Sequence, residues 1–351
     1  MGFRLDVGAV RRMAVFACWM LAAAAAFAQP QQDVRGATRV VVLSDFNESY
    51  GSVAYSRHVD DAVARTVALQ PDLVISTGDM VAGQRLHPPL ERDRIDAMWR
   101  AFHDHVSDPL AKAGLPFAVT PGNHDASSGE RFRRERAAYR DQWLPRKPTV
   151  EMVDGTHYPF HYAFRVGEVL FASLDATHVG HLSSTEKAWL AALLEREGPR
   201  VRHRVVFSHV PLWPFGVGRE TEFLGDPELE RILQDGRVDV HLSGHHHAYY
   251  PGYKDGVRYV SQGCLGAAPR PLIGTQHRPP RTITVIDFDR DGRIRVEAYR
   301  EPDFTQTVAR HTLPPRIETR WATILRDDLA GGAVRGAESA RRGQMSASGR
   351  Q

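Results

Sequence analysis

Short uninterrupted apolar runs recur along the chain, and polar residues follow each of them. Runs of this kind are typical of buried strands in α/β proteins, where both faces of the sheet are covered. We expect strands in five segments, namely ATRVVVLSD (37–45), PDLVISTGD (71–79), LPFAVTPGNHD (115–125), HRVVFSHVP (203–211) and VDVHLSGH (238–245). Each of them brings an aspartate, an asparagine or a histidine to the place where the strand stops.

Apolar residues at helical spacing predict helices between these strands. The helices are expected at 54–70, at 91–114 as one helix or two, and at 185–197. The segment 158–176 predicts two antiparallel strands joined through Gly167, and β-rich runs follow at 257–263, 281–289 and 293–300. A β-α-β-α-β start with later antiparallel strands is typical of α/β folds. We therefore predict a four-layer α/β/β/α sandwich of mixed sheets flanked by helices, formed by one domain at 36–313.

The first 28 residues predict a secretory signal peptide. Arg4, Arg11 and Arg12 precede the apolar stretch MAVFACWMLAAAAAF (13–27), and Ala28 completes a small-x-small cleavage site. An uncleaved anchor is the alternative, and the arginine pair leaves twin-arginine export open. We expect an exported protein, periplasmic or secreted, without a stable membrane anchor. The small, polar and basic segment 331–351 predicts a disordered tail.

Charge and cysteine content narrow the range of partners. The chain has 45 Lys and Arg against 42 Asp and Glu, and loss of residues 1–28 removes three arginines and one aspartate, leaving about +1. This balance gives no reason to expect nucleic acid or an anionic membrane as a partner. Cleavage also removes Cys18, and the remaining Cys264 is expected to be a small buried apolar residue.

The polar residues at the strand ends form a set of possible metal ligands without a thiolate. Oxygen and imidazole donors of this kind suit Zn, Mn or Fe, and two such ions need a bridging carboxylate. If SGHHHAYY (243–250) leaves its strand in an extended conformation, His245 and His247 share a face and His246 points away. We therefore expect His245 and His247 to be ligands and His246 to be a bystander. The full set is Asp45, Asp79, Asn123, His209, His245 and His247.

Five ordered motifs resemble the calcineurin-like metallophosphoesterase superfamily, of the purple acid phosphatase and metallophosphatase type. They are SDFN (44–47), TGDMVAG (77–83), PGNHD (121–125), SHVP (208–211) and SGHHH (243–247). The resemblance covers roughly residues 37–300. It implies two divalent or trivalent metal ions, Mn, Fe or Zn.

The resemblance also assigns roles to individual residues. It implies that Asp45 and His247 bind metal one and that Asp79 bridges the two ions. Metal two is then bound by Asn123, with His209 and His245 beside it. His124 corresponds to the histidine that approaches the scissile phosphate and stabilises or protonates the leaving group.

The first motif departs from the family pattern. The family usually has Asp-x-His, whereas this chain has Asp45-Phe46-Asn47. Some members carry a tyrosine three residues after the second aspartate, but this position is Ala82 here. Metal one is then completed by Asn47, by Tyr50 or by water, and we expect weaker or differently selective binding there.

The expected function is hydrolysis of small-molecule phosphate esters, with monoesters favoured. The alternatives are a phosphodiesterase acting on nucleotides or envelope lipids, and a non-catalytic metal-binding protein on the same scaffold. Two further sets remain open between a structural and a substrate-binding role. The first is the arginines Arg131, Arg133 and Arg134, and the second is the aromatic residues Trp213, Phe215, Tyr249 and Tyr250.

Overall fold

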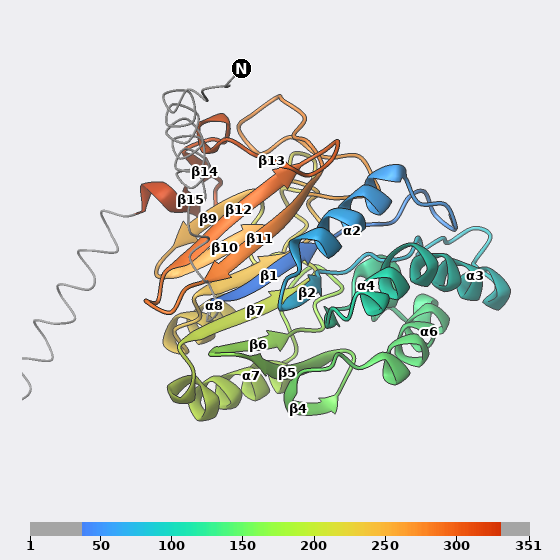
Figure 1. Cartoon of the computed structure of the whole chain (residues 1–351), viewed down its shortest axis with the longest axis horizontal. Coiled ribbons are helices and arrows are strands. Elements are labelled where there is room, and N and C mark those ends of the chain that lie inside the picture. The colour runs from blue at the N-terminus through green and yellow to red at the C-terminus, as the bar shows by residue number, and fades with distance from the viewer. Residues whose placement is uncertain (1–36, 331–351) are drawn as a thin grey trace, which may run out of the picture. The chain divides into compact units, whose positions relative to one another are not determined.

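The predicted apolar runs form the centres of two mixed β-sheets in the computed structural model, which describes residues 37–330 (Figure 1). The proposed signal peptide at 1–28 and the tail at 331–351 lie outside the described residues. No helix within 37–330 has the length and apolarity needed to span a membrane.

The first sheet has six strands in the order β13-β12-β11-β1-β2-β3. The strands β1, β2 and β3 run parallel to one another, and β11 pairs with β1 in the antiparallel sense. Their bounds are β1 (Thr38–Leu43), β2 (Leu73–Ser76), β3 (Phe117–Val119), β11 (Thr282–Phe288), β12 (Ile294–Arg300) and β13 (Gln306–Thr307).

The second sheet has nine strands in the order β14-β15-β9-β10-β8-β7-β6-β5-β4. The central strands β6, β7, β8 and β10 pair in parallel, and the outer pairs are antiparallel. Their bounds are β4 (Glu151–His157), β5 (His161–Val166), β6 (Val169–Ser173), β7 (His203–Ser208), β8 (Val240–Ser243), β9 (Tyr250–Lys254), β10 (Val257–Ser261), β14 (Arg316–Glu318) and β15 (Thr323–Arg326).

Helices make the crossovers that parallel strands require. Between β1 and β2 runs α2, α3 and α4 connect β2 to β3, α7 connects β6 to β7, and α8 connects β7 to β8 (Figure 1). A π-helical turn at His103–Ser107 separates α3 from α4. The helix bounds are α2 (Arg57–Leu69), α3 (Arg92–Phe102), α4 (Asp108–Lys112), α5 (Asn123–Ala126), α6 (Arg133–Trp143), α7 (Ser184–Glu197) and α8 (Pro227–Asp235).

The predicted fold class is confirmed, and the differences lie at its edges. β14 and β15 extend the nine-stranded sheet through pairing with β9, so the domain end expected at residue 313 was placed too early. These strands are short and rich in charged residues, which hides them in the sequence pattern. The helix α8 was also missed, although Asp226 caps it by accepting from the N–H groups of Glu228 and Leu229.

Aromatic side chains join the two sheets across their buried faces. Phe171 of β6 meets Phe288 of β11 edge to face, with ring centroids 6.4 Å apart. The hydroxyl of Tyr162 on β5 donates to the carbonyl of Val119 on β3 at 2.7 Å. A buried Tyr needs such a partner. The sheets are therefore held in a fixed relation close to the end of β3.

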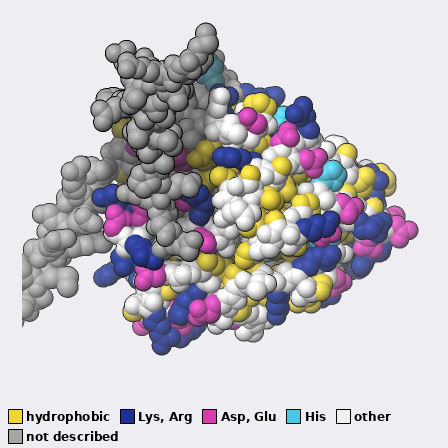
Figure 2. Space-filling view, in the orientation of Figure 1, with side chains coloured by type: hydrophobic (Ala, Val, Ile, Leu, Met, Phe, Trp, Pro, Cys, Tyr) yellow, Lys and Arg dark blue, Asp and Glu magenta, His cyan; other side chains and the backbone are white. Residues whose placement is uncertain are grey.

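The molecular surface carries charges of both signs. Figure 2 shows acidic and basic side chains interspersed on the face that it draws. Ion pairs such as Arg92–Asp96 and Arg202–Glu168 have exposed side chains, and exposed pairs contribute little to stability. The fold therefore depends on its buried core.

A chain of polar contacts supports the loop that carries the GNHD motif. Arg136 donates to the carbonyl of Ala126 at 2.7 Å and pairs with Asp175. The backbone N–H of Asp175 in turn donates to Oε1 of Glu186 at 2.7 Å. Burial raises the pKa of Glu186 to about 7. This carboxyl is therefore protonated in the folded protein at pH values where it is ionised in the unfolded chain.

This difference predicts a stability loss as pH rises. Between pH 4.5 and about 7 the folded state keeps a proton that the unfolded chain releases, so the free energy of unfolding falls through that window. Glu186→Gln keeps the acceptor oxygen and removes the titration. Urea unfolding at pH 5 and pH 7.5 should show the wild type losing up to about 3 kcal/mol more than the variant. The exposed Glu195→Gln is the matched control on the same helix. Parallel wild-type and Glu186→Gln profiles would contradict the assignment.

Candidate metal centre

Five strand ends converge at one edge of the two sheets. The loops after β1, β2 and β3 carry oxygen donors, and the loops after β7 and β8 carry imidazoles. Since parallel strands present their carboxyl ends at the same edge, side chains from distant parts of the sequence meet there. The six-stranded sheet thus supplies Asp45, Asp79 and Asn123, and the nine-stranded sheet supplies His209, His245 and His247.

Four of these residues adopt a left-handed backbone conformation, which non-glycine residues rarely do. Their φ angles are 52° at Asp45, 55° at Asp79, 67° at His245 and 53° at His247. β8 ends at Ser243, so the extended conformation expected for the histidine run is wrong. Sharp turns of the loop set the directions of the histidine side chains instead. Strained backbone of this kind concentrates at functional sites.

Glycines let the loops approach one another closely. A Cβ atom at Gly122 would lie 2.1 Å from the backbone nitrogen of Asp79. One at Gly78 would lie 2.8 Å from Nδ1 of His209. No side chain fits at such distances. The glycines of the GD and GNHD motifs are therefore needed for the packing of the loops that carry the candidate ligands.

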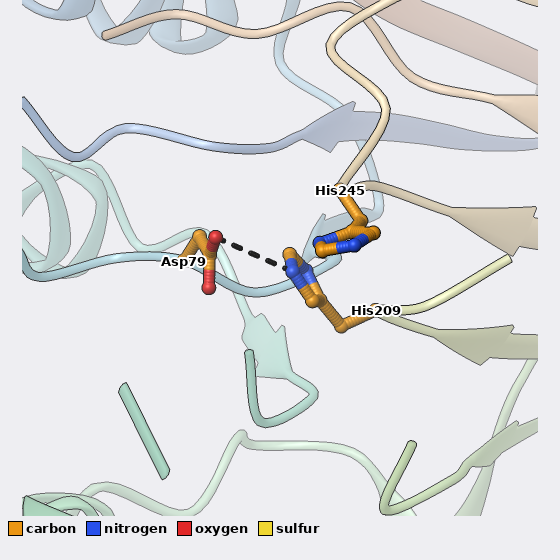
Figure 3. A group of neighbouring side chains, drawn as sticks. All are labelled: Asp79, His209 and His245. Atoms are coloured by element: carbon orange, nitrogen blue, oxygen red, sulfur yellow. Dashed lines mark ion pairs between the residues drawn. The ribbon is translucent and has the colours of Figure 1, made fainter. Parts of the chain in front are cut away.

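Three hydrogen-bond acceptors contact the ring nitrogens of His209, and Figure 3 draws one of them, Asp79. Its Nδ1 contacts the carbonyl of Thr77 at 2.8 Å, and because a carbonyl only accepts, Nδ1 carries the hydrogen. Its Nε2 lies 3.3 Å from Oδ2 of Asp79 and 2.8 Å from Oδ1 of Asn123. The amide of Asn123 is oriented by Gln84, whose Oε1 accepts from Nδ2 at 2.9 Å. The point where these lone pairs converge requires a proton or a cation.

The pKa of His209 also indicates that a positive charge is favoured here. Burial opposes the charged imidazolium, but the carboxylates of Asp79 and Asp45 outweigh burial and raise the pKa of His209 to about 9. His209 is fully buried. A positive charge is therefore favoured at this position, and a bound cation can supply it.

Asp45 and His247 form a second pair of donors. Nε2 of His247 lies 3.2 Å from Oδ1 of Asp45, while its Nδ1 donates to the carbonyl of Ala268 at 3.3 Å. Burial opposes protonation of His247, but Asp45 outweighs it and raises the pKa of His247 well above its usual range. Asp45 also accepts from the N–H of His245 at 3.1 Å, which joins the two sheets at the site.

His245 brings an imidazole with a free lone pair. Burial lowers the pKa of His245 to about 4, so the ring is neutral at pH 7. Its Nε2 is buried and makes no hydrogen bond within residues 37–330, although Oε2 of Glu222 lies 3.3 Å away. One donor atom each from Asp79, His209 and His245 lie within 4.8 Å of one another (Figure 3). This spacing suits a single cation.

The open question in the first motif concerns Asn47 and Tyr50. Oδ1 of Asn47 is buried and has no hydrogen-bond partner in the described part of the chain, and a buried polar atom without a partner is costly. Tyr50 is 57% exposed, and its ring stacks on that of His124 at a centroid distance of 5.3 Å. The burial of its unsatisfied oxygen favours Asn47 over Tyr50 as a ligand.

His124 is held by two contacts and keeps one nitrogen free. Its backbone N–H donates to Oδ1 of Asp79 at 2.9 Å, and its Nδ1 donates to the carbonyl of Gly83 at 3.0 Å. Nε2 lies 3.9 Å from Oδ2 of Asp79. The imidazole therefore presents Nε2 beside the carboxylate at the centre of the site.

His246, expected to be a bystander, has a structural role. Its Nδ1 accepts from the backbone N–H groups of Phe215 at 3.0 Å and Gly216 at 3.3 Å. Its Nε2 donates to the carbonyl of Glu222 at 2.8 Å. Burial lowers the pKa of His246 to about 3, so the ring is neutral. It fastens the 215–222 loop to the loop that carries His245 and His247.

Two supporting residues were missed in the sequence. Asp125 accepts from the backbone N–H groups of Met80 at 2.6 Å, Val81 at 2.8 Å and Gly122 at 3.1 Å, and so ties two ligand loops together. Its place in the GNHD motif was the available signal. Glu222 had no local signal, because only the fold brings it to His245.

The two sets of residues left open between structural and binding roles differ in burial. Arg133 pairs with Glu130 and Arg134 lies 3.9 Å from Glu91, all with mostly exposed side chains. The four aromatic residues are buried, which confirms packing as their role: Trp213, Phe215, Tyr249 and Tyr250.

The donor set fits metal ions. Carboxylate and amide oxygens converge with imidazole nitrogens, and backbone carbonyls hold Nδ1 of both His209 and His247. Second contacts of this kind fix the tautomer of metal-binding histidines. Oδ1 of Asn47 and Nε2 of His245 are buried without hydrogen-bond partners among residues 37–330.

Comparisons with known proteins identify the family. The model of the calcineurin-like phosphoesterase family matches residues 38–249. The serine/threonine-protein phosphatase CPPED1 of Bos taurus is 23% identical over 228 residues, covering 62% of this chain and 64% of the relative. Purple acid phosphatase 18 of Arabidopsis thaliana is 29% identical over 161 residues, covering 45% of this chain and 35% of the relative. The chain thus spans less than two thirds of the length of each.

Solved structures show the same fold. The purple acid phosphatase PPD1 from yellow lupin seeds has a TM-score of 0.53 at 14% identity, covering 75% of this chain and 51% of its own. A dimetal phosphatase from Danio rerio has a TM-score of 0.53 at 14% identity, covering 77% of this chain and 98% of its own. The resemblance carried by the five motifs is confirmed at the level of the family. The chain belongs to the calcineurin-like phosphoesterase family.

Proposed function

We propose that the protein is a dinuclear metal-dependent phosphoesterase that favours small-molecule phosphate monoesters. The observation that carries this proposal is the convergence of two side-chain oxygens on Nε2 of His209. Oδ1 of Asn123 lies 2.8 Å from this nitrogen, and Oδ2 of Asp79 lies 3.3 Å from it. Such a group is stable only around positive charge. Beside it stands His124, which a protein that merely stored metal would not need.

Each ion would have its own donors. Asp45, Asn47 and His247 would hold the first, Asn123, His209 and His245 the second, and Asp79 would serve both. When bound, Mn, Fe or Zn ions would neutralise the phosphate charge and lower the pKa of a water molecule. The chain's own part is to keep these donors buried and oriented.

His124 would act on the leaving group. Its Nδ1–H is fixed by the carbonyl of Gly83, so a second proton can enter or leave only at Nε2. An imidazolium Nε2–H donates to the leaving oxygen as the ester bond breaks, and the alcohol departs neutral. The stacked ring of Tyr50 limits rotation of the imidazole.

The compartment is part of the proposal. The basic and apolar pattern of residues 1–28 supports export, with a mature chain in the periplasm or outside the cell. Sequencing the N-terminus of the protein recovered from the exported fraction tests the cleavage expected near Ala28.

The first prediction for the function is hydrolysis by the metal-loaded protein. With Mn, Zn or Fe bound, an aryl phosphate should be cleaved faster than the corresponding bis-aryl phosphate, because the dianionic monoester gains more from the positive charge of the site. Steady-state rates and the metal content of the same sample are the measurements. Faster cleavage of the diester would overturn the monoester preference, and no cleavage of any ester at full loading would overturn the enzymatic function.

The second prediction concerns His124→Asn. A lost proton donor should lower kcat about 10²- to 10⁴-fold for alkyl phosphates and much less for nitrophenyl phosphate, whose leaving group needs no proton. The exposed His178→Asn is the control. Equal losses on both substrates would exclude His124 as the donor.

The third prediction concerns the first motif. Asn47→Ala removes the buried Oδ1 and should lower the metal content from two ions toward one per chain, with a lower Tm because bound metal stabilises the folded state. Tyr50→Phe removes only the hydroxyl and should keep full loading. Elemental analysis after dialysis distinguishes the two residues, and unchanged content in Asn47→Ala removes Asn47 from the ligand set.

A further inference from the structure

The 215–222 loop and the segment around Arg270 form one platform at the edge of the metal centre. The N–H of Val217 donates to the carbonyl of Pro271 at 2.8 Å, and the N–H of Ile273 donates to that of Phe215 at 2.8 Å. The two segments are therefore paired like short antiparallel strands. Arg270 anchors the platform to the ligand loop, because its N–H donates to the carbonyl of His247 at 3.1 Å.

One of the two arginines on the platform has no paired carboxylate among the described residues, although Glu220 and Glu222 balance the net charge. Arg219 pairs with Glu222, whose Oε2 also faces Nε2 of His245 at 3.3 Å. Arg270 is half-buried, its Nε is fully buried, and its guanidinium has no hydrogen-bond or ion-pair partner among residues 37–330. The carboxylate of Glu222 is thus engaged by Arg219 and His245, and Arg270 is left without a counter-charge in contact with it. The buried Nε–H of Arg270 therefore lacks an acceptor among the described residues, and an anion bound to this guanidinium would supply one.

Arg270 faces the loop that borders the site. A Cβ atom at Gly218, where φ is 78°, would lie 3.8 Å from Nη1 of Arg270. After burial, the charges that act most strongly on the pKa of Arg270 are those of Arg219 and Glu222, followed by weaker contributions that include Asp45.

We infer that Arg270, with Arg219 beside it, binds a second anionic group of the substrate, a phosphate or a carboxylate separate from the scissile phosphate. The inference rests on the proposed phosphoesterase function and specifies its substrate class. Planar guanidinium groups bind both anions through paired N–H donors. The fixed platform holds the donor fork in place, and Gly218 leaves room for the bound group.

The test compares Arg270→Ala and Arg270→Lys with the wild type on three monoesters. One has a neutral aryl leaving group, one carries a carboxylate on the leaving group, and one carries a second phosphate. Arg270→Ala should raise KM about 10- to 100-fold for an anionic leaving group, as expected for one charge-assisted contact, and should change phenyl phosphate by less than about 3-fold. Arg270→Lys should fall between, because it keeps the charge but loses the fork.

The carboxylate and phosphate arms identify the anion, and an effect confined to either one supports the inference. Arg258→Ala, at the opposite end of β10 from the site, is the matched control. Equal loss on all three esters, or no loss on any, would overturn the inference.

A binding experiment separates this inference from the proposed activity. Metal-loaded wild type should bind pyrophosphate more tightly than inorganic phosphate in calorimetry, and Arg270→Ala should lose most of that difference. This readout needs no turnover. If the wild type cleaves no ester but shows the Arg270-dependent difference, the function fails and the anion subsite stands. Equal differences in wild type and variant overturn the subsite.

Discussion

The candidate metal centre brings buried hydrogen-bond acceptors together at the carboxyl edge of the two sheets, and these atoms repel one another unless a positive charge lies between them. Asp79, Asn123 and His209 point lone pairs at one another from three separate loops, and Asp45 faces His247 in the same way. In a buried environment such contacts are strongly unfavourable without positive charge between them. The raised pKa values of both histidines express this requirement. Binding of cations would therefore belong to the energetics of the fold as well as to catalysis.

The candidate ligands differ in chemistry between the two sheets. The six-stranded sheet contributes the oxygen donors, and the nine-stranded sheet contributes the imidazoles. A cation bound between them would link the two layers of the sandwich, much as the hydrogen bond that the N–H of His245 donates to Asp45 already does. The aromatic contact between Phe171 and Phe288 fixes the layers elsewhere, so the site does not have to hold the sheets together alone.

The sequence predicted the strands well because buried parallel strands are continuous apolar runs, and the residues after them follow from topology. The argument that sends His245 and His247 to one pocket by strand alternation is wrong, because both residues have a left-handed backbone. The sequence missed Glu222, whose approach to His245 depends on a loop fastened by His246. The strands β14 and β15 were missed because short, charged edge strands leave no apolar pattern. Local patterns thus locate ligands at strand ends, whereas contacts between loops require the fold.

His246 lies between the candidate ligands His245 and His247 and holds two loops together through its ring nitrogens. Its neutral ring accepts two backbone N–H groups and donates to one carbonyl, so both nitrogens are satisfied inside the protein. A protonated ring could not accept from Phe215 and Gly216, and burial keeps the pKa of His246 low enough to prevent protonation at ordinary pH. The position of the 215–222 loop is thereby tied to the same backbone turns that aim His245 and His247. One short segment consequently sets both the position of the candidate ligands and that of the platform beside them. If the proposed site binds metal and substrate, a change in this segment would alter both together.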